Sequence, residues 1–157
     1  MDEIPLSALL IVLVVLLAMS AFFSLSETAM MASNRFRLRH LAQSGHHGAQ
    51  KAVALLDKTD KMLGVILLGN NLINSAAATL VGVITIDLFG EEKWALAAGT
   101  LAVTFAILVF SEITPKIIGA THADRLAIRL GYILTPLLRL FYPAVWFINL
   151  FASGLLR

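Results

Sequence analysis

The chain has 157 residues, of which 59% are hydrophobic and only 14% charged, and its mean hydropathy is +0.85. This composition excludes an ordinary soluble domain and predicts one all-α, multi-pass membrane domain over residues 1–157. The formal net charge is only +2, and the chain has no cysteine, which excludes disulfides, thiolate metal sites and cysteine nucleophiles.

The first predicted transmembrane helix covers residues 4–32. Its first 20 residues are almost purely apolar, and the helix then runs into the polar stretch Ser24–Thr28. A stretch of about 20 apolar residues is long enough to cross the hydrocarbon core as a helix. We do not expect a cleaved signal peptide, because Asp2 and Glu3 stand where basic residues would precede one.

A basic segment, residues 33–61, follows the first span. Ser33 is predicted to cap a helix that ends near Leu41, and Gly45 and Gly48 are predicted to separate it from a second helix. We expect an amphipathic helical hairpin at the membrane surface. Its basic residues are Arg35, Arg37, Arg39, Lys51, Lys58 and Lys61.

The second predicted span, residues 62–87, contains three amides within five residues, Asn70, Asn71 and Asn74. Asn70 lies about 12 Å along the helix from its start, well inside a bilayer. Buried polar groups need partners in hydrocarbon. Because Asn70 and Asn74 are four residues apart, they share one helix face, which predicts one wall of a polar site near mid-membrane.

The third predicted span, residues 94–112, ends in Ser111 and Glu112. Pro115 lacks an N–H and clashes with the carbonyl four residues earlier, so we expect the helix to open there and to act as a hinge.

Residues 113–157 are apolar but contain three arginines and the helix breakers Pro136 and Pro143. We expect kinked interfacial helices there, which complete a juxtamembrane belt on the cytoplasmic side.

The distribution of Lys and Arg sets the orientation. Residues 33–61 hold six of them, whereas residues 87–93 hold one beside three acids, so the basic segment belongs in the cytoplasm. The N-terminus is then outside, the C-terminus is cytoplasmic, and the chain is a multi-pass protein of the inner or plasma membrane. The polar ends of spans one and three meet the same membrane side, with the amides of span two between them.

Hydroxyl, amide and carboxylate oxygens are hard ligands that suit Mg²⁺, Ca²⁺ or Na⁺. Ser24, Asn70, Asn74 and Glu112 are the predicted side-chain ligands, and Gly69 is a predicted source of a backbone carbonyl. A second carboxylate, Glu27, is a candidate for binding Na⁺ or for a gate, and Lys116, next to Pro115, is a further candidate for the hinge or gate.

Structural roles are open for the same residues. A membrane serine commonly bonds a carbonyl of its own helix, an asparagine often joins two helices, and Glu27 or Glu112 can face headgroups or pair with Lys116. No metalloprotease, serine-hydrolase or phosphate-loop motif is present, so neither an enzyme nor a nucleic-acid partner is expected.

Three motifs resemble one family. The patterns S-x-S-E at Ser24–Glu27, G-N-N-x-x-N at Gly69–Asn74 and E-x-x-P-K at Glu112–Lys116 occur in order. They are similar to the transmembrane domain, catalogued as DUF21, of bacterial CorC proteins and animal cyclin M (CNNM) proteins. The similarity extends over essentially the whole chain. Many relatives have glycine where this chain has Ser111, which leaves open whether this hydroxyl adds a ligand.

The resemblance implies a Mg²⁺ transporter, an exporter coupled to Na⁺ entry, with three transmembrane helices and a juxtamembrane belt. It also implies a homodimer and downstream cytosolic CBS domains that bind ATP. Its Mg²⁺ site maps onto Ser24, Asn70, Asn74 and Glu112, with backbone carbonyls. The alternatives are a Mg²⁺-sensing regulator of another transporter, without transport of its own, and a purely structural dimerisation module.

Overall fold

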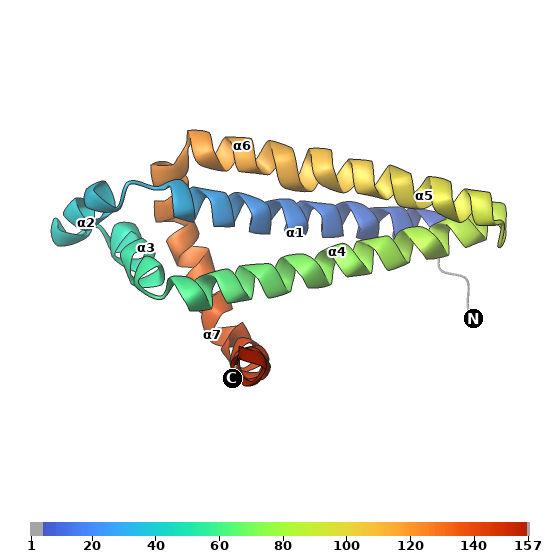
Figure 1. The fold of residues 1–157 in the computed structure, drawn as a ribbon. Coiled ribbons are helices and arrows are strands. Elements are labelled where there is room, and N and C mark those ends of the chain that lie inside the picture. Colours follow the sequence, from blue (N-terminus) through green and yellow to red (C-terminus); the bar gives the residue numbers. More distant parts are fainter. Residues whose placement is uncertain (1–4, 157) are drawn as a thin grey trace. The chain divides into compact units, whose positions relative to one another are not determined.

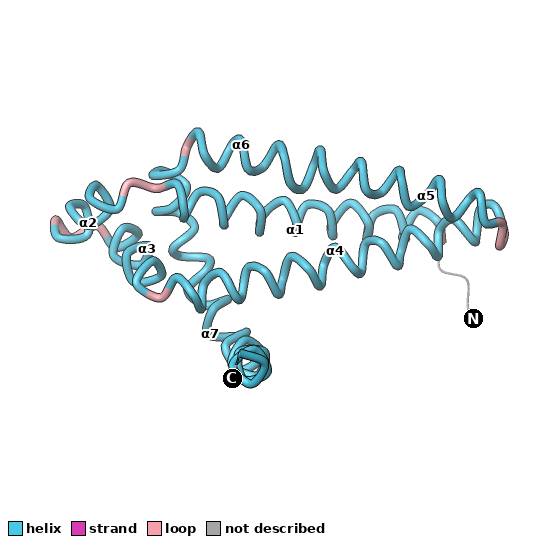
Figure 2. Tube along the Cα trace, in the orientation of Figure 1, coloured by secondary structure: helices cyan, strands magenta, loops and turns pink. Residues whose placement is uncertain are grey.

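The computed structural model describes residues 5–156, and every regular element in that range is a helix. Figures 1 and 2 show the helices and the short loops between them. Asp2, Glu3 and Ile4, where the first span was predicted to begin, lie outside the described residues. The elements are α1 (Leu6–Ala32), α2 (Arg35–Gln43), α3 (His47–Asp57), α4 (Thr59–Phe89), α5 (Lys93–Ala106), the π-helix η1 (Ile107–Ile113), α6 (Thr114–Thr121) and α7 (Ala123–Leu156).

The helices form two compact units, each built from two segments of the chain. The first comprises residues 5–24 and 69–115, and the second comprises residues 25–68 and 116–156. In sequence, the divisions in α1, in α4 and in α6 fall at or beside the three predicted motifs.

In the first unit, α1, α4 and α5 run side by side (Figure 1). Small residues allow this approach: a Cβ on Gly99 of α5 would lie 2.8 Å from Oγ1 of Thr85 on α4. Gly90 adopts a left-handed φ of 77°, which lets the chain turn sharply between α4 and α5.

The third span was predicted to end at residue 112, but the helix continues beyond that residue. Its helical path continues through η1 into α6, and the whole stretch Lys93–Thr121 is long and apolar enough to cross a membrane. The opening expected before Pro115 takes the form of a π-helix rather than a break. A π-helix inserts one extra residue per turn, and such insertions are common at functional sites.

In the second unit, the hairpin forms as expected, with two corrections. The cap of α2 is Asn34 and not Ser33, since the Asn34 side chain accepts from the Arg37 N–H, while Ser33 donates to a carbonyl of α1. Gly45, with a φ of 95°, separates α2 from α3, but Gly48 lies inside α3. There a Cβ would lie 2.6 Å from the Ile128 side chain, so Gly48 allows α7 to pack closely.

Among residues 5–156, four helical stretches, and not three, are long and apolar enough to cross a membrane, because α7 also meets these criteria. The predicted break at Pro136 and Pro143 is wrong: α7 continues through both prolines, although it bends along its length (Figure 1). Packing on either side of the prolines explains this continuity, since Leu134 and Val145 are both buried. With several apolar helices of this length, the chain is a multi-pass membrane protein.

Candidate functional site

The polar side chains of the first unit meet at one point between three helices. Ser20 of α1 lies with its Oγ 2.8 Å from Oδ1 of Asn70 and 2.7 Å from Oδ1 of Asn74, both on α4. Asn70 Nδ2 donates to Oε1 of Glu112 in η1, at 3.3 Å. We call Ser20, Asn70, Asn74 and Glu112 the oxygen cluster. It brings together three of the predicted ligands.

The hydrogen bond to Glu112 orients the amide of Asn70. With Nδ2 donating to the carboxylate, Oδ1 points towards Ser20. A hydroxyl carries one proton, so Ser20 donates to only one of the two amide oxygens at a time. Three oxygens thus share one proton between them, and such an arrangement favours an added cation.

Ser24, another predicted ligand, lies one helical turn after Ser20 on the same face of α1. Its side chain is 1% exposed, and its Oγ has no hydrogen-bond partner. A buried hydroxyl left without a partner costs stability, so Ser24 is a candidate to bind a group that the protein itself does not supply.

The remaining predicted residues of the first unit have packing contacts. Ser111 is fully buried, and its Oγ donates to the carbonyl of Leu17 at 3.0 Å, which joins η1 to α1. Gly69 lies against Phe23, whose ring would be 2.7 Å from an added Cβ. The ligand roles predicted for both therefore stay predictions. Pro115, the predicted hinge, is buried at the end of this unit.

Glu27 and Lys116 lie in the second unit. Both line one pocket of about 350 Å³, together with Thr28, Met31 and Ala32. This placement of an acid and a base in a single pocket is compatible with either the predicted gate or a simple ion pair.

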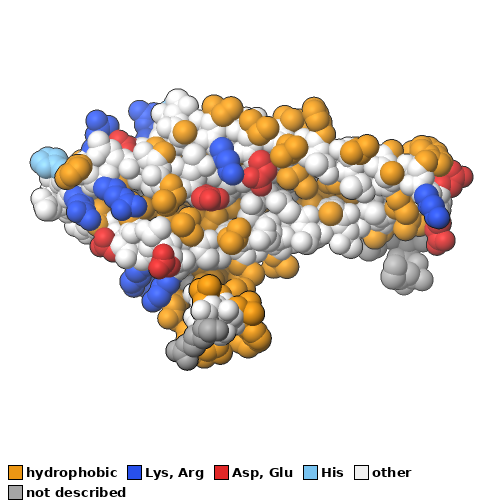
Figure 3. All heavy atoms as spheres, viewed as in Figure 1, with side chains coloured by type: hydrophobic (Ala, Val, Ile, Leu, Met, Phe, Trp, Pro, Cys, Tyr) orange, Lys and Arg blue, Asp and Glu red, His pale blue; other side chains and the backbone are white. Residues whose placement is uncertain are grey.

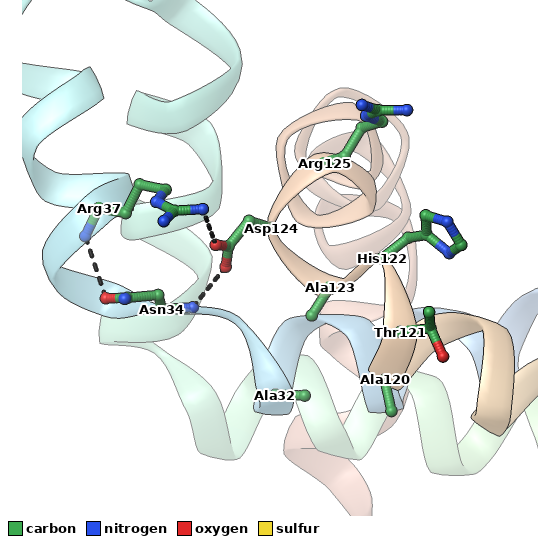
Figure 4. Close-up of a pocket in the computed structure, with 9 residues that line it drawn as sticks. All are labelled: Ala32, Asn34, Arg37, Ala120, Thr121, His122, Ala123, Asp124 and Arg125. Atoms are coloured by element: carbon green, nitrogen blue, oxygen red, sulfur yellow. Dashed lines mark hydrogen bonds and ion pairs between the residues drawn. The ribbon is translucent and has the colours of Figure 1, made fainter.

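A second pocket in the same unit, of about 410 Å³, is formed where α2 and α7 begin (Figure 4). Asp124 accepts from the Asn34 N–H at 2.5 Å and from Arg37 at 3.0 Å. Figure 4 shows His122 and Arg125 pointing away from this pair. The contact therefore joins two helix ends and presents no converging ligands.

Sequence reasoning missed Ser20 as a site residue. The signal was present, since Ser20 and Ser24 are four residues apart, as are Asn70 and Asn74. Within residues 5–156, no group of three or more His, Cys, Asp or Glu side chains is placed to hold a metal. A cation site in the described part of the chain would therefore need hydroxyl, amide or carbonyl oxygens in addition to a carboxylate such as that of Glu112.

These features define a multi-pass helical membrane domain with a partly buried oxygen cluster between three helices. The family model of the cyclin M transmembrane N-terminal domain matches residues 11–157. The chain therefore belongs to the CNNM, or DUF21, family, as the motifs indicated.

The chain is 46% identical over its whole length to a UPF0053 protein of Haemophilus influenzae, of which it covers 37%. It is 41% identical over 138 residues to a UPF0053 inner membrane protein of Escherichia coli K12, covering 88% of the chain and 32% of that protein. It is 28% identical to a polyamine export protein of Salmonella typhimurium, covering 90% of the chain and 34% of that protein. The chain thus spans about a third of the length of these relatives.

Proposed function

We propose that this domain carries Mg²⁺ across the membrane and binds it in the oxygen cluster, with Ser24 as an additional ligand. The observation that supports this most directly is the meeting of Ser20, Asn70 and Asn74 oxygens within 2.8 Å, one turn from a buried hydroxyl that has no partner. Small hard cations favour such oxygens, and cation binding would satisfy all of them together.

Charge supports transport rather than permanent retention. Glu112 is the one carboxylate in the cluster, so a bound divalent cation would keep a net positive charge. Mg²⁺ prefers about six oxygens. Ser20, Ser24, Asn70, Asn74 and Glu112 would supply five, and a backbone carbonyl such as that of Gly69 would supply another.

Alternating access requires a helix that can change its register or angle near the site. The π-helix that contains Glu112 ends just before Pro115, which lacks the N–H of a regular helix. We propose this segment as the hinge. Glu27 and Lys116 would form a gate on the cytoplasmic side, with Na⁺ as the coupling ion and export as the direction.

The proposed arrangement has three crossings, with the N-terminus outside and α7 at the cytoplasmic interface, where its arginines avoid the bilayer centre. Cytosolic CBS domains would follow in the full protein. A homodimer would cover an exposed polar face of α4, because Asn71, Ser75 and Thr79 recur every four residues and are exposed. Packing against a second copy would give these groups partners.

The test is a flux assay in proteoliposomes with a Mg²⁺-sensitive dye, paired with isothermal titration of the same preparation. Glu112→Gln keeps the shape of the side chain and removes its charge, so we expect Mg²⁺ affinity and flux both to fall at least about tenfold. Glu91→Gln, in the exposed turn after α4, is the matched control and should change neither.

Each alternative has its own outcome. Binding without flux would favour the sensing regulator, and neither binding nor flux would favour the structural module. The names of the polyamine export relatives make a polyamine the competing cargo. Flux of spermidine with no flux of Mg²⁺ would overturn the proposal for the metal while keeping a cation transporter.

A further inference from the structure

The α2–α3 hairpin is joined to α1 and α4, two candidate membrane spans, by very short connections. Two residues separate the end of α1 from the start of α2, and one residue separates α3 from α4. A fully extended residue spans at most about 3.6 Å, so neither connection lets the hairpin move far from the helix ends. Since α1 and α4 are both candidate spans, the hairpin lies at the headgroup level of one leaflet.

One side chain of this hairpin is exposed in an unusual way. Phe36 of α2 is 86% exposed, whereas Leu38, on the opposite side of the same short helix, is fully buried. Phe36 therefore points away from the packed interior of the second unit. A large apolar side chain at headgroup level is stable when it enters the acyl region, as aromatic residues of interfacial helices do.

Cationic side chains surround Phe36. Arg39 and His40 are three and four residues further along α2 and so share its face, and Arg35 and Arg37 flank it. Arg37 is already paired with Asp124, and Arg35 and Arg39 line a small pocket with Asp57. Over residues 33–61, six Lys or Arg stand against two Asp, and Figure 3 shows Lys and Arg gathered over α2 and α3.

We propose that α2 is an anchor for anionic lipid. Phe36 inserts below the headgroups, and Arg35 and Arg39 bind lipid phosphates beside it. The position of the hairpin favours a lipid partner over a protein, because the Phe36 ring lies at headgroup level, where lipid is the surrounding material. This role goes beyond cation transport, and its test does not depend on which cation the domain carries.

The first experiment measures depth. Because the chain has no cysteine, Phe36→Cys provides one labelling position for a nitroxide in nanodiscs that contain phosphatidylglycerol. Ser44→Cys, in the exposed turn after α2, is the control. We expect the label at 36 to be reached better by oxygen, and less by a water-soluble nickel reagent, than the label at 44. Equal access to water, or shielding from both reagents as by a covering protein, would overturn the proposal.

The second experiment measures charge selectivity. The thermal stability of the purified protein is titrated with phosphatidylglycerol, with phosphatidylcholine and with inorganic phosphate. At about fivefold per basic residue near an anionic surface, Arg35→Gln with Arg39→Gln should weaken the response to phosphatidylglycerol by about 25-fold. Lys93→Gln, at the first residue of α5, should leave that response unchanged. An equal response to phosphatidylcholine or to inorganic phosphate, or a double variant like the wild type, would contradict the assignment.

Discussion

Replacing Ser24 with alanine should raise the stability of the cation-free protein and lower its affinity for Mg²⁺. The Ser24 hydroxyl is buried without a hydrogen-bond partner. Leaving such a group unsatisfied costs about 1–3 kcal/mol, and alanine removes that cost while losing only one buried atom. A structural serine would behave in the opposite way, because its loss would break a bond.

After the small loss of packing, the free energy of unfolding of the cation-free protein should rise by about 1 kcal/mol. For a chain of this size, that rise corresponds to an increase of about 2–4 °C in Tm. The expected loss of affinity is about 10- to 100-fold, if a neutral ligand to the ion is worth as much as a hydrogen bond to a charged group, about 1.5–3 kcal/mol.

The assay pairs thermal unfolding in nanodiscs with EDTA against isothermal titration with Mg²⁺. Ser20→Ala is the matched control for stability, because Ser20 is equally buried but hydrogen-bonded, so its loss should destabilise the cation-free protein by about 0.5–1.5 kcal/mol. A Ser24→Ala variant with a lower Tm and an unchanged Mg²⁺ affinity would refute the reasoning.

Three further changes test the neighbouring claims. Asn70→Leu should lower Mg²⁺ affinity, measured by titration, at least about tenfold. Asn71→Leu, one residue away but exposed, should keep that affinity and should instead weaken cross-linking between copies. Equal Mg²⁺ affinities for the two variants would place the site elsewhere. Gly119→Ala should lower the free energy of unfolding by about 1–3 kcal/mol, because its Cβ would lie 2.9 Å from a carbonyl of α1. Gly82→Ala is the control and should not lower it, because a Cβ there meets open space. Equal Tm values for the two variants would contradict the close packing of Gly119 against α1. Pro115→Ala restores an N–H that can reach the carbonyl four residues earlier, so flux should fall more than Mg²⁺ affinity does, and an unchanged flux would exclude the hinge.

The sequence alone was enough to predict the class of the protein and most of its helices. Apolar runs of this length have no stable alternative to helices in a bilayer, because each backbone polar group must bond within its own segment. The four-residue spacing of Asn70 and Asn74 was likewise enough to place both on one face of α4, because helix geometry is local. The three polar motifs likewise predicted the family, and the match of the family model to residues 11–157 confirms it.

Tertiary structure decided which face of each helix meets which neighbour. The spacing of residues in the sequence could not predict whether Ser20 or Ser24 contacts the amides, since both occupy the same face of α1. The position of α1 along the axis of α4 brings Ser20 to Asn70 and Asn74. Nor could the spacing predict that Pro115 would be accommodated by a π-helix, or that α7 would continue through two prolines. Local rules set the preferences of a segment, whereas packing against other helices sets its rotation, register and continuity.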